Sequence, residues 1–195
     1  MQATDDAGRR ADLGFYAAFA TRGEILGTGI GADPAAWEAA LGPDHLDDPG
    51  EGTLRRDHGL VELSFSAAEK PLGRSSSRPF SCYGISVQVH RLAHDAPTAP
   101  LVPSALVREY GQFAPRVRFE ELRSAILSLG CTVEPEDLSA DIHRYRVPES
   151  GARVFVIDDP DPYGDGHHDT DDPETAQAGD VWALSVCPAW WGASP

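Results

Sequence analysis

The chain has 195 residues and a mass of 20.9 kDa, and its 31 acidic side chains against 16 basic ones give a formal net charge of −15. A protein this acidic is repelled by phosphate backbones and by anionic membrane surfaces, which argues against DNA, RNA or phospholipid as a partner. The apolar content of 41% excludes disorder of the whole chain, and the length suffices for one domain or two small halves.

The sequence predicts a cytoplasmic protein. The polar start MQATDDAGRR is not followed by the apolar core of a secretory signal, and no run of about 20 apolar residues occurs. The cysteines Cys82, Cys131 and Cys187 lie far apart and form no C-x-x-C motif. We therefore expect reduced thiols rather than disulfides.

In the first half, residues 1–10 are expected to form a loose terminus, and the periodicity of residues 11–20 does not decide between helix and strand. A helix is predicted from Pro34 because Asp33 can cap it, and Gly42 should end it. After a loop at 45–52, strands are predicted at 53–57, 60–66 and 80–92. The side chains expected on one face of the last strand are those of Tyr83, Ile85, Val87 and Val89.

In the second half, prolines mark residues 97–118 as a linker that contains a short helix, which Ser104 could cap and Gly111 should end. Residues 119–129 have the strongest helical periodicity in the chain, and Gly130 should end that helix. Strands are predicted at 141–147, 152–158 and 181–187, with an acidic stretch at 158–180 before the last of them.

The two halves thus share one plan, a helix followed by three strands, and this plan predicts an α+β fold with antiparallel strands. The fold would consist of two similar α-β-β-β units packed as one compact domain. The predicted boundaries are an N-terminal segment at 1–23, a first unit at 24–96, the linker at 97–118 and a second unit at 119–195.

Glycines at 27 and 29 before a helix resemble a dinucleotide-binding fingerprint, but the strand before them is short and no parallel βαβ unit follows. We interpret residues 24–42 as a glycine turn that leads into a capped helix, and we expect no cofactor. His90 and His94 have the i, i+4 spacing of metal ligands on a helix, but His90 lies in a predicted strand, where that spacing does not apply.

The acidic stretch 158–180 is the most unusual segment, because its nine acids account for more than half of the net charge. Asp159, Asp161 and Gly164 fit positions of a calcium-binding EF-hand loop, but Thr170 stands where that loop needs a glutamate. A solvated loop, a surface for a basic partner and a metal site that also uses His167 and His168 all remain open.

The C-terminal tryptophans Trp182, Trp190 and Trp191 suit either core packing or an interface, where aromatic anchors are common. Catalytic and phosphate-binding motifs are missing, so the sequence gives no support for an enzyme. The candidate partner-binding residues are therefore acids of the acidic stretch and two of the tryptophans: Asp158, Asp159, Asp161, Asp165, Asp169, Asp171, Asp172, Glu174, Trp190 and Trp191.

Four stretches, ILGTGIGADPAAWEAALGPD, LRRDHGLVELSF, GISVQVHRL and GDVWALSVCPAWW, together resemble immunity-type proteins of bacterial polymorphic-toxin systems. The doubled plan is also similar to the tandem-repeat β-lactamase inhibitor protein. The resemblance implies a small non-enzymatic protein that neutralises a cognate toxin domain by occluding its active site, and it assigns no functional residue. From the charge we expect that toxin domain to be basic, and the alternatives are a metal-binding protein or a structural domain.

Overall fold

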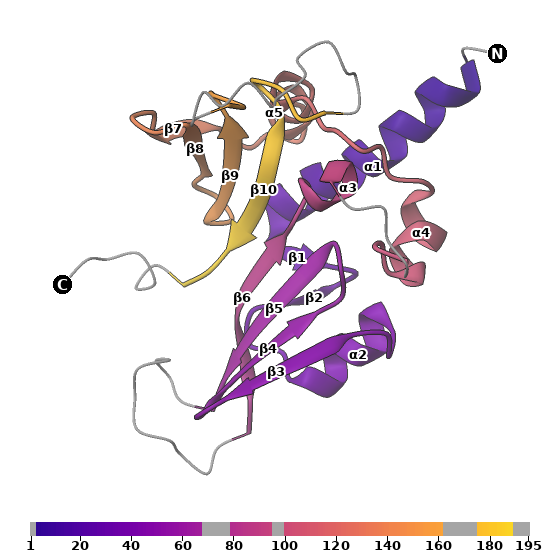
Figure 1. Ribbon diagram of the computed structural model, residues 1–195, viewed down its shortest axis with the longest axis vertical. Helices are drawn as coiled ribbons and strands as arrows, with labels where there is room; N and C mark the ends of the chain where they lie inside the picture. Colours follow the sequence, from indigo (N-terminus) through magenta and orange to yellow (C-terminus); the bar gives the residue numbers. More distant parts are fainter. Residues whose placement is uncertain (1–2, 68–78, 95–99, 162–174, 189–195) are drawn as a thin grey trace.

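The computed structural model describes residues 3–67, 79–94, 100–161 and 175–188, without the side chains of residues 3–10 and 94. These residues form a mixed architecture of helices and antiparallel sheet (Figure 1). The helices are α1 (Ala3–Arg22), α2 (Pro34–Leu41), α3 (Arg91–His94), α4 (Ser104–Tyr110) and α5 (Phe119–Ser128). No described helix is both long and apolar enough to cross a membrane.

The strands form a small hairpin and one large sheet. The hairpin pairs β1 (Glu24–Ile25) with β2 (Thr28–Gly29). The large sheet has the order β3-β4-β5-β6-β10-β9-β8-β7, with every neighbouring pair antiparallel. Its strands are β3 (Leu46–Gly50), β4 (Thr53–Asp57), β5 (Val61–Ser66), β6 (Ser81–Val87), β7 (Glu134–Asp137), β8 (Ile142–Val147), β9 (Ala152–Ile157) and β10 (Val181–Val186).

The sheet consists of two meanders of four strands, joined where β6 pairs with β10. Helix α2 precedes the first meander and α5 precedes the second. The predicted antiparallel α+β class is confirmed. Each helix, however, is followed by four described strands rather than three, because β3 and β7 lie where the sequence predicted loops.

Strands β3 and β7 are the two edges of the sheet, which explains why their sequences look like loops. Their sequences, LDDPG and EPED, carry acids and a proline. An edge strand pairs on one side only, so it tolerates a proline, and its acids discourage pairing with another chain. All five residues of β3 are exposed, so no apolar alternation marks it.

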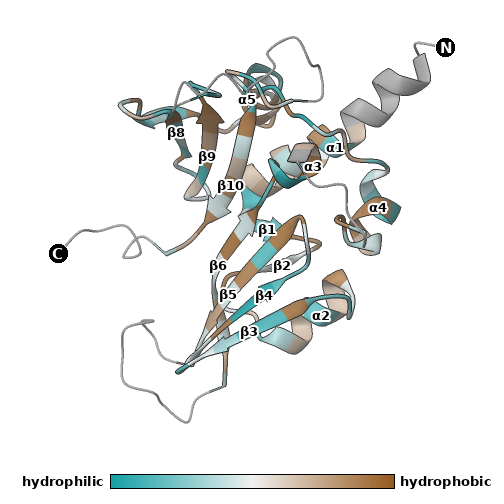
Figure 2. Cartoon of the chain, in the orientation of Figure 1, coloured by the Kyte–Doolittle hydropathy of each residue, from teal (hydrophilic) through white to brown (hydrophobic). Residues whose placement is uncertain are grey.

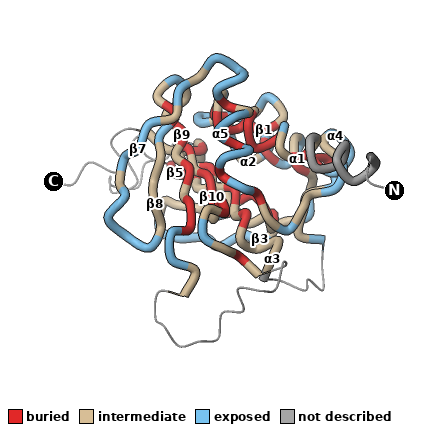
Figure 3. The backbone as a smooth tube through the Cα atoms, turned by 90° about the horizontal axis from the view of Figure 1, so that it is seen from above, coloured by how far each residue is buried: buried red, intermediate tan, exposed pale blue. Residues whose placement is uncertain are grey.

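The core lies between one face of the sheet and the helices. Seen from above, α1 and α5 lie together beside the sheet (Figure 3). Helix α2 lies on the same side, because the buried Arg56 of β4 donates a hydrogen bond to the Pro34 carbonyl. Apolar colours concentrate in the central strands, whereas hydrophilic colours dominate β3 and β4 (Figure 2). Helix α1 contacts α5, β9 and β10, and buries Phe15, Tyr16 and Phe19. The expected loose terminus is therefore wrong from residue 3, since α1 runs unbroken from Ala3 to Arg22.

Local signals placed α2, α4 and α5 well, although Ser104 begins α4 and does not cap it. Helix α3 was not predicted, because the predicted strand 80–92 ends at Val87. The Asp33 carboxylate accepts a hydrogen bond from the Ala36 N–H at 2.8 Å, and α2 ends before Gly42, as predicted. Leu26 and Gly27 both have positive φ, which is typical of a tight two-residue hairpin turn, so the interpretation of residues 24–42 is confirmed. Helix α5 begins at Phe119 as predicted and ends one residue short of Leu129, which is 57% exposed.

Candidate binding surface

The lining residues of a hollow of about 490 Å³ alternate along the strands with residues buried against the helices, so the hollow lies on the opposite face of the sheet, which we call the open face. Every residue that lines the hollow lies on a strand or directly after one, so no helix contributes to it. The lining comes from both meanders, because β6 and β10 meet beneath it. On β5, for example, Ser64 faces the hollow while its neighbours Leu63 and Phe65 are fully buried in the core.

A β-bulge turns Tyr83 onto the open face. Ser64 pairs with Gly84, but Phe65 pairs with Cys82, so the bulge leaves Tyr83 between two register pairs. Cys82 is therefore buried on the core side, and Tyr83 lines the hollow. The predicted grouping of Tyr83 with the core residues of this strand is wrong, because an extra residue in one strand shifts the alternation.

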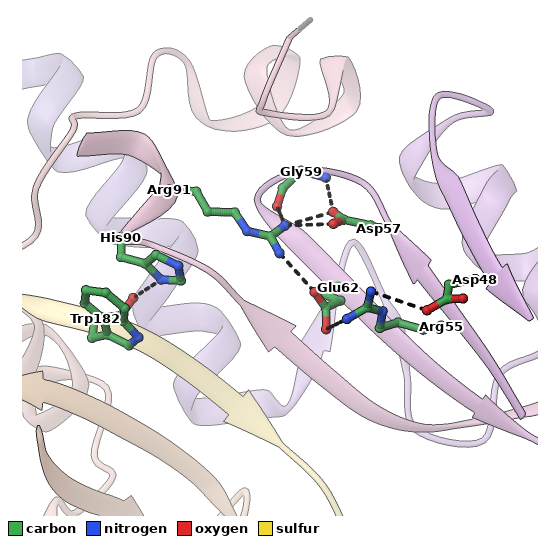
Figure 4. A network of polar contacts seen from close by, with 8 residues as sticks. All are labelled: Asp48, Arg55, Asp57, Gly59, Glu62, His90, Arg91 and Trp182. Atoms are coloured by element: carbon green, nitrogen blue, oxygen red, sulfur yellow. Dashed lines mark hydrogen bonds and ion pairs between the residues drawn. The ribbon is translucent and has the colours of Figure 1, made fainter. Parts of the chain in front are cut away.

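Trp182 and Phe155 add two more half-buried aromatic side chains to the lining. The Trp182 ring stacks on the ring of His90, with centroids 4.0 Å apart and planes 4° from parallel. The His90 ring nitrogen Nδ1 lies 3.3 Å from the Trp182 carbonyl oxygen (Figure 4), and the His90 backbone N–H donates to the same oxygen at 3.0 Å. These contacts fix the Trp182 side chain at the boundary between the two meanders.

A cluster of charged side chains crosses three strands of the second meander. Arg153 on β9 donates two hydrogen bonds to Glu136 on β7, at 2.8 and 3.1 Å. Arg144 on β8 forms an ion pair with the same carboxylate at 2.7 Å. The hydrogen bonds between Arg153 and Glu136 lower the pKa of the Glu136 carboxyl and raise the pKa of the Arg153 guanidinium. Burial raises the pKa of Cys187, whose sulfur lies 3.7 Å from Arg153, so this lining thiol is neutral at pH 7.

A second charged cluster lies on the first meander. Arg91 at the start of α3 contacts the Asp57 carboxylate at 2.9 Å, the Gly59 carbonyl at 2.7 Å and Glu62 at 3.0 Å (Figure 4). Arg55 on β4 reaches the other carboxylate oxygen of Glu62 at 3.9 Å. This cluster holds the chain after β6 against β4 and β5, and so fixes one side of the open face.

The structure describes three of the ten predicted partner-binding residues. Asp158 and Asp159 are exposed after the end of β9, and the Asp158 carboxylate lies 3.5 Å from the ring of His143. Asp159 accepts a hydrogen bond from the Asp161 N–H. None of these three residues lines the hollow. The others lie outside the described residues: Asp165, Asp169, Asp171, Asp172, Glu174, Trp190 and Trp191.

The last acid of the acidic stretch, Asp180, has a structural role. It is 2% exposed, and its carboxylate accepts hydrogen bonds from Arg116 at 2.6 Å and from Arg118 at 2.9 Å. Within the described part of the chain, no group of three or more His, Cys, Asp or Glu residues is arranged to hold a metal ion. His167 and His168, which a metal site in the stretch would use, lie outside that part.

The hollow could have been found only in part from the sequence. Arg153 and Phe155 alternate with buried valines on β9, and this pattern marks them as outward-facing. Nothing in the sequence shows that β6 and β10 meet, which is what brings Tyr83 and Trp182 to one site. No protein-family model, curated protein or solved structure matches this chain.

Proposed function

We propose that this chain is a non-enzymatic binding protein of the immunity type, which neutralises a cognate toxin domain by covering the toxin's active site with the open face. The observation that carries this proposal is the hollow itself, which holds three half-buried aromatic rings and two arginines and to which no described helix contributes. Tyrosine, tryptophan and arginine are the residues that most often dominate binding energy at protein interfaces.

The rigidity of the surface supports the same function. The lining residues lie on paired strands or directly after them, and the charged clusters of Glu136 and Arg91 hold neighbouring strands in place. A surface that is ordered before binding loses little conformational entropy on association. Such a face can receive a protruding loop from a folded partner, which is what occlusion of an active site requires.

The charge of the chain supports a basic toxin domain. With a net charge of −15, the protein attracts a basic partner over a distance of about a Debye length, near 8 Å at physiological salt. The acidic stretch 158–180 follows β9 and precedes β10, and both of these strands contribute to the hollow. We propose that its acids speed the encounter and that the open face holds the complex.

We also propose that the two halves of the chain are two similar units, α2 with β3 to β6 and α5 with β7 to β10, which meet where their last strands β6 and β10 pair. The order of one helix and then four strands in each half supports this view. The hollow then lies at the junction of the units, and neither unit could form it alone.

The test is binding to the purified product of the adjacent gene, which we expect to contain a toxin domain. The variants Tyr83→Ala, Phe155→Ala and Trp182→Ala should each weaken binding about tenfold or more, since a hot-spot side chain contributes about 2 kcal/mol. Leu129→Ala is the matched control, because that exposed side chain lies at the end of α5. It should change the affinity less than twofold.

Two results would reject the proposal. One is that the adjacent product contains no toxin domain and does not bind. The other is that the three aromatic variants bind as tightly as the unaltered protein while the complex forms normally, which would place the interface on another surface. Circular dichroism of each variant shows whether it is folded, so that loss of structure is not taken for loss of binding.

A further inference from the structure

The hollow carries a local charge opposite to that of the whole protein. Its charged lining residues are Arg144, Arg153 and Glu136, which sum to one positive charge, whereas the chain has a net charge of −15. The next carboxylate, that of Asp137, does not line the hollow and lies 3.8 Å from Arg144. It already accepts hydrogen bonds from the N–H and hydroxyl of Ser139.

The two arginines keep unused donors. A guanidinium has five N–H groups, and Arg153 directs Nε and one Nη2 hydrogen to Glu136. Its Nη1 contacts only the neutral sulfur of Cys187 among the described residues. Arg144 pairs with the same Glu136 carboxylate through Nε at 2.7 Å and, at 3.8 Å, with Asp137 through Nη2. Within the hollow itself two guanidinium groups face the single carboxylate of Glu136, and Nη1 of Arg153 is left to bind a second carboxylate without displacing the first.

Apolar surface lies directly beside these donors. Arg144 and Phe155 are register partners on β8 and β9, and Arg153 is two residues from Phe155 on the same face of β9. Register partners on one face of an antiparallel pair have Cβ atoms about 5 Å apart. A side chain that places its methylenes against Phe155 can thus direct its terminal group to both arginines.

We propose that the hollow binds an aspartate or glutamate side chain from a protruding loop of the protein partner, held between Arg144 and Arg153 with its methylenes against Phe155. This proposal depends on the proposed function in one respect: the carboxylate belongs to a protein partner. Bidentate arginine–carboxylate pairs are strong and directional, and partial burial of both arginines strengthens them.

An acidic anchor is compatible with a basic partner. The negative field of the whole chain acts at long range and is screened by salt, whereas the anchor acts only after contact, inside a hollow where water is partly excluded. The partner's carboxylate would therefore lie within a basic surface, and its recognition would contribute specificity.

Glu136 gives the site a distinctive prediction, because it competes with the incoming carboxylate. Glu136→Gln keeps the size of the side chain but removes its charge, and so leaves both arginines with stronger attraction for an anion. If Glu136 instead received a lysine or arginine of the partner, the same substitution would weaken binding. The direction of the change separates the two possibilities.

The first measurement needs no partner. The ¹⁵N-labelled protein is titrated with acetyl-Phe-Glu-amide, and with the uncharged control acetyl-Phe-Gln-amide, while the Arg Nε–H signals and the amides of β8 and β9 are followed by NMR. We expect saturable shifts with the Glu peptide alone. The dissociation constant should fall about threefold or more in Glu136→Gln and rise at least about fivefold in Arg153→Gln. Equal shifts with both peptides, or none with either, would overturn the proposal.

The second measurement uses the product of the adjacent gene. Arg144→Gln and Arg153→Gln should each weaken that complex about tenfold or more, while Glu136→Gln should bind at least as tightly as the unaltered protein. If the aromatic variants weaken the complex and the arginine variants do not, the immunity function stands and the carboxylate anchor is wrong. If the Glu peptide binds as predicted and the adjacent product does not, the anchor stands and the immunity function is wrong.

Discussion

The substitution Asp180→Asn tests whether the last acid of the acidic stretch belongs to the fold. The Asp180 carboxylate is 3% exposed and accepts hydrogen bonds from Arg116, Arg118 and the Gln177 N–H. Asparagine removes the charge and presents an NH₂ group to a guanidinium. Breaking a buried ion pair costs about 3 to 5 kcal/mol, but Arg118 is 44% exposed and can recover hydration. We therefore expect the free energy of unfolding to fall by about 3 kcal/mol.

Urea denaturation at pH 7.5 measures this loss. With a slope near 2 kcal/mol per molar, typical of a protein of this size, the midpoint should fall by about 1.5 M. Asp158→Asn is the matched control in the same stretch, since its carboxylate is 58% exposed and 3.5 Å from His143. It should cost less than about 0.5 kcal/mol. Equal costs for the two variants would refute the structural role of Asp180.

Two further predictions concern the turn after β4. Gly59 has φ +81°, and an added Cβ would overlap the backbone carbonyl of Leu101. Gly59→Ala should therefore cost about 3 kcal/mol or more by urea denaturation, against about 1 kcal/mol for Gly151→Ala, where φ is +74° but the space is open. A similar loss of stability in both variants would mean that the positive φ, and not the contact with Leu101, determines the cost of the substitution. Burial, followed by the charge of His45, lowers the pKa of His58 from 6.5 to about 4. Between pH 6.5 and about pH 4 the unfolded chain therefore binds more protons than the folded protein. The contribution of neutral His58 to the free energy of unfolding is fully present above pH 6.5 and is lost as the pH falls toward 4. Between pH 7.5 and pH 5 the loss should be about 2 kcal/mol, and His58→Phe should remove that part of the slope. An unchanged slope in this variant would show that folding does not lower the pKa of His58.

Elements with strong local signals were predicted well from the sequence. Helix α2 has a capping aspartate, a proline at its first position and a terminal glycine, and each of these acts within a few residues. Helix α5 has apolar residues at helical spacing, of which Phe119, Leu122 and Ile126 are buried. Signals of this kind depend on nearest neighbours, so one sequence is enough to locate them.

Features that carry no local pattern and are defined only by a pairing partner were not predicted. Strand β3 is extended because β4 pairs with it, although its own residues have no alternating pattern. The bulge at Tyr83 depends on the register in which β6 pairs with β5, and a prediction based on strict alternation of side chains did not include it. Helix α1 was left undecided between helix and strand at residues 11–20 for another reason. Five of its residues are buried, and so wide an apolar face has no clear period: Phe15, Tyr16, Ala17, Phe19 and Ala20.

The feature that dominates the composition and the site that the geometry favours occupy different parts of the molecule. The sequence directs attention to the acids at 158–180, whereas the hollow is lined by aromatic residues and by two arginines to one glutamate. Association and dissociation should therefore depend on different residues. Neutralising exposed acids such as Asp158 should slow association and weaken its dependence on salt. Truncating Phe155 or Trp182 should instead speed dissociation, because contacts inside the hollow form only after the encounter.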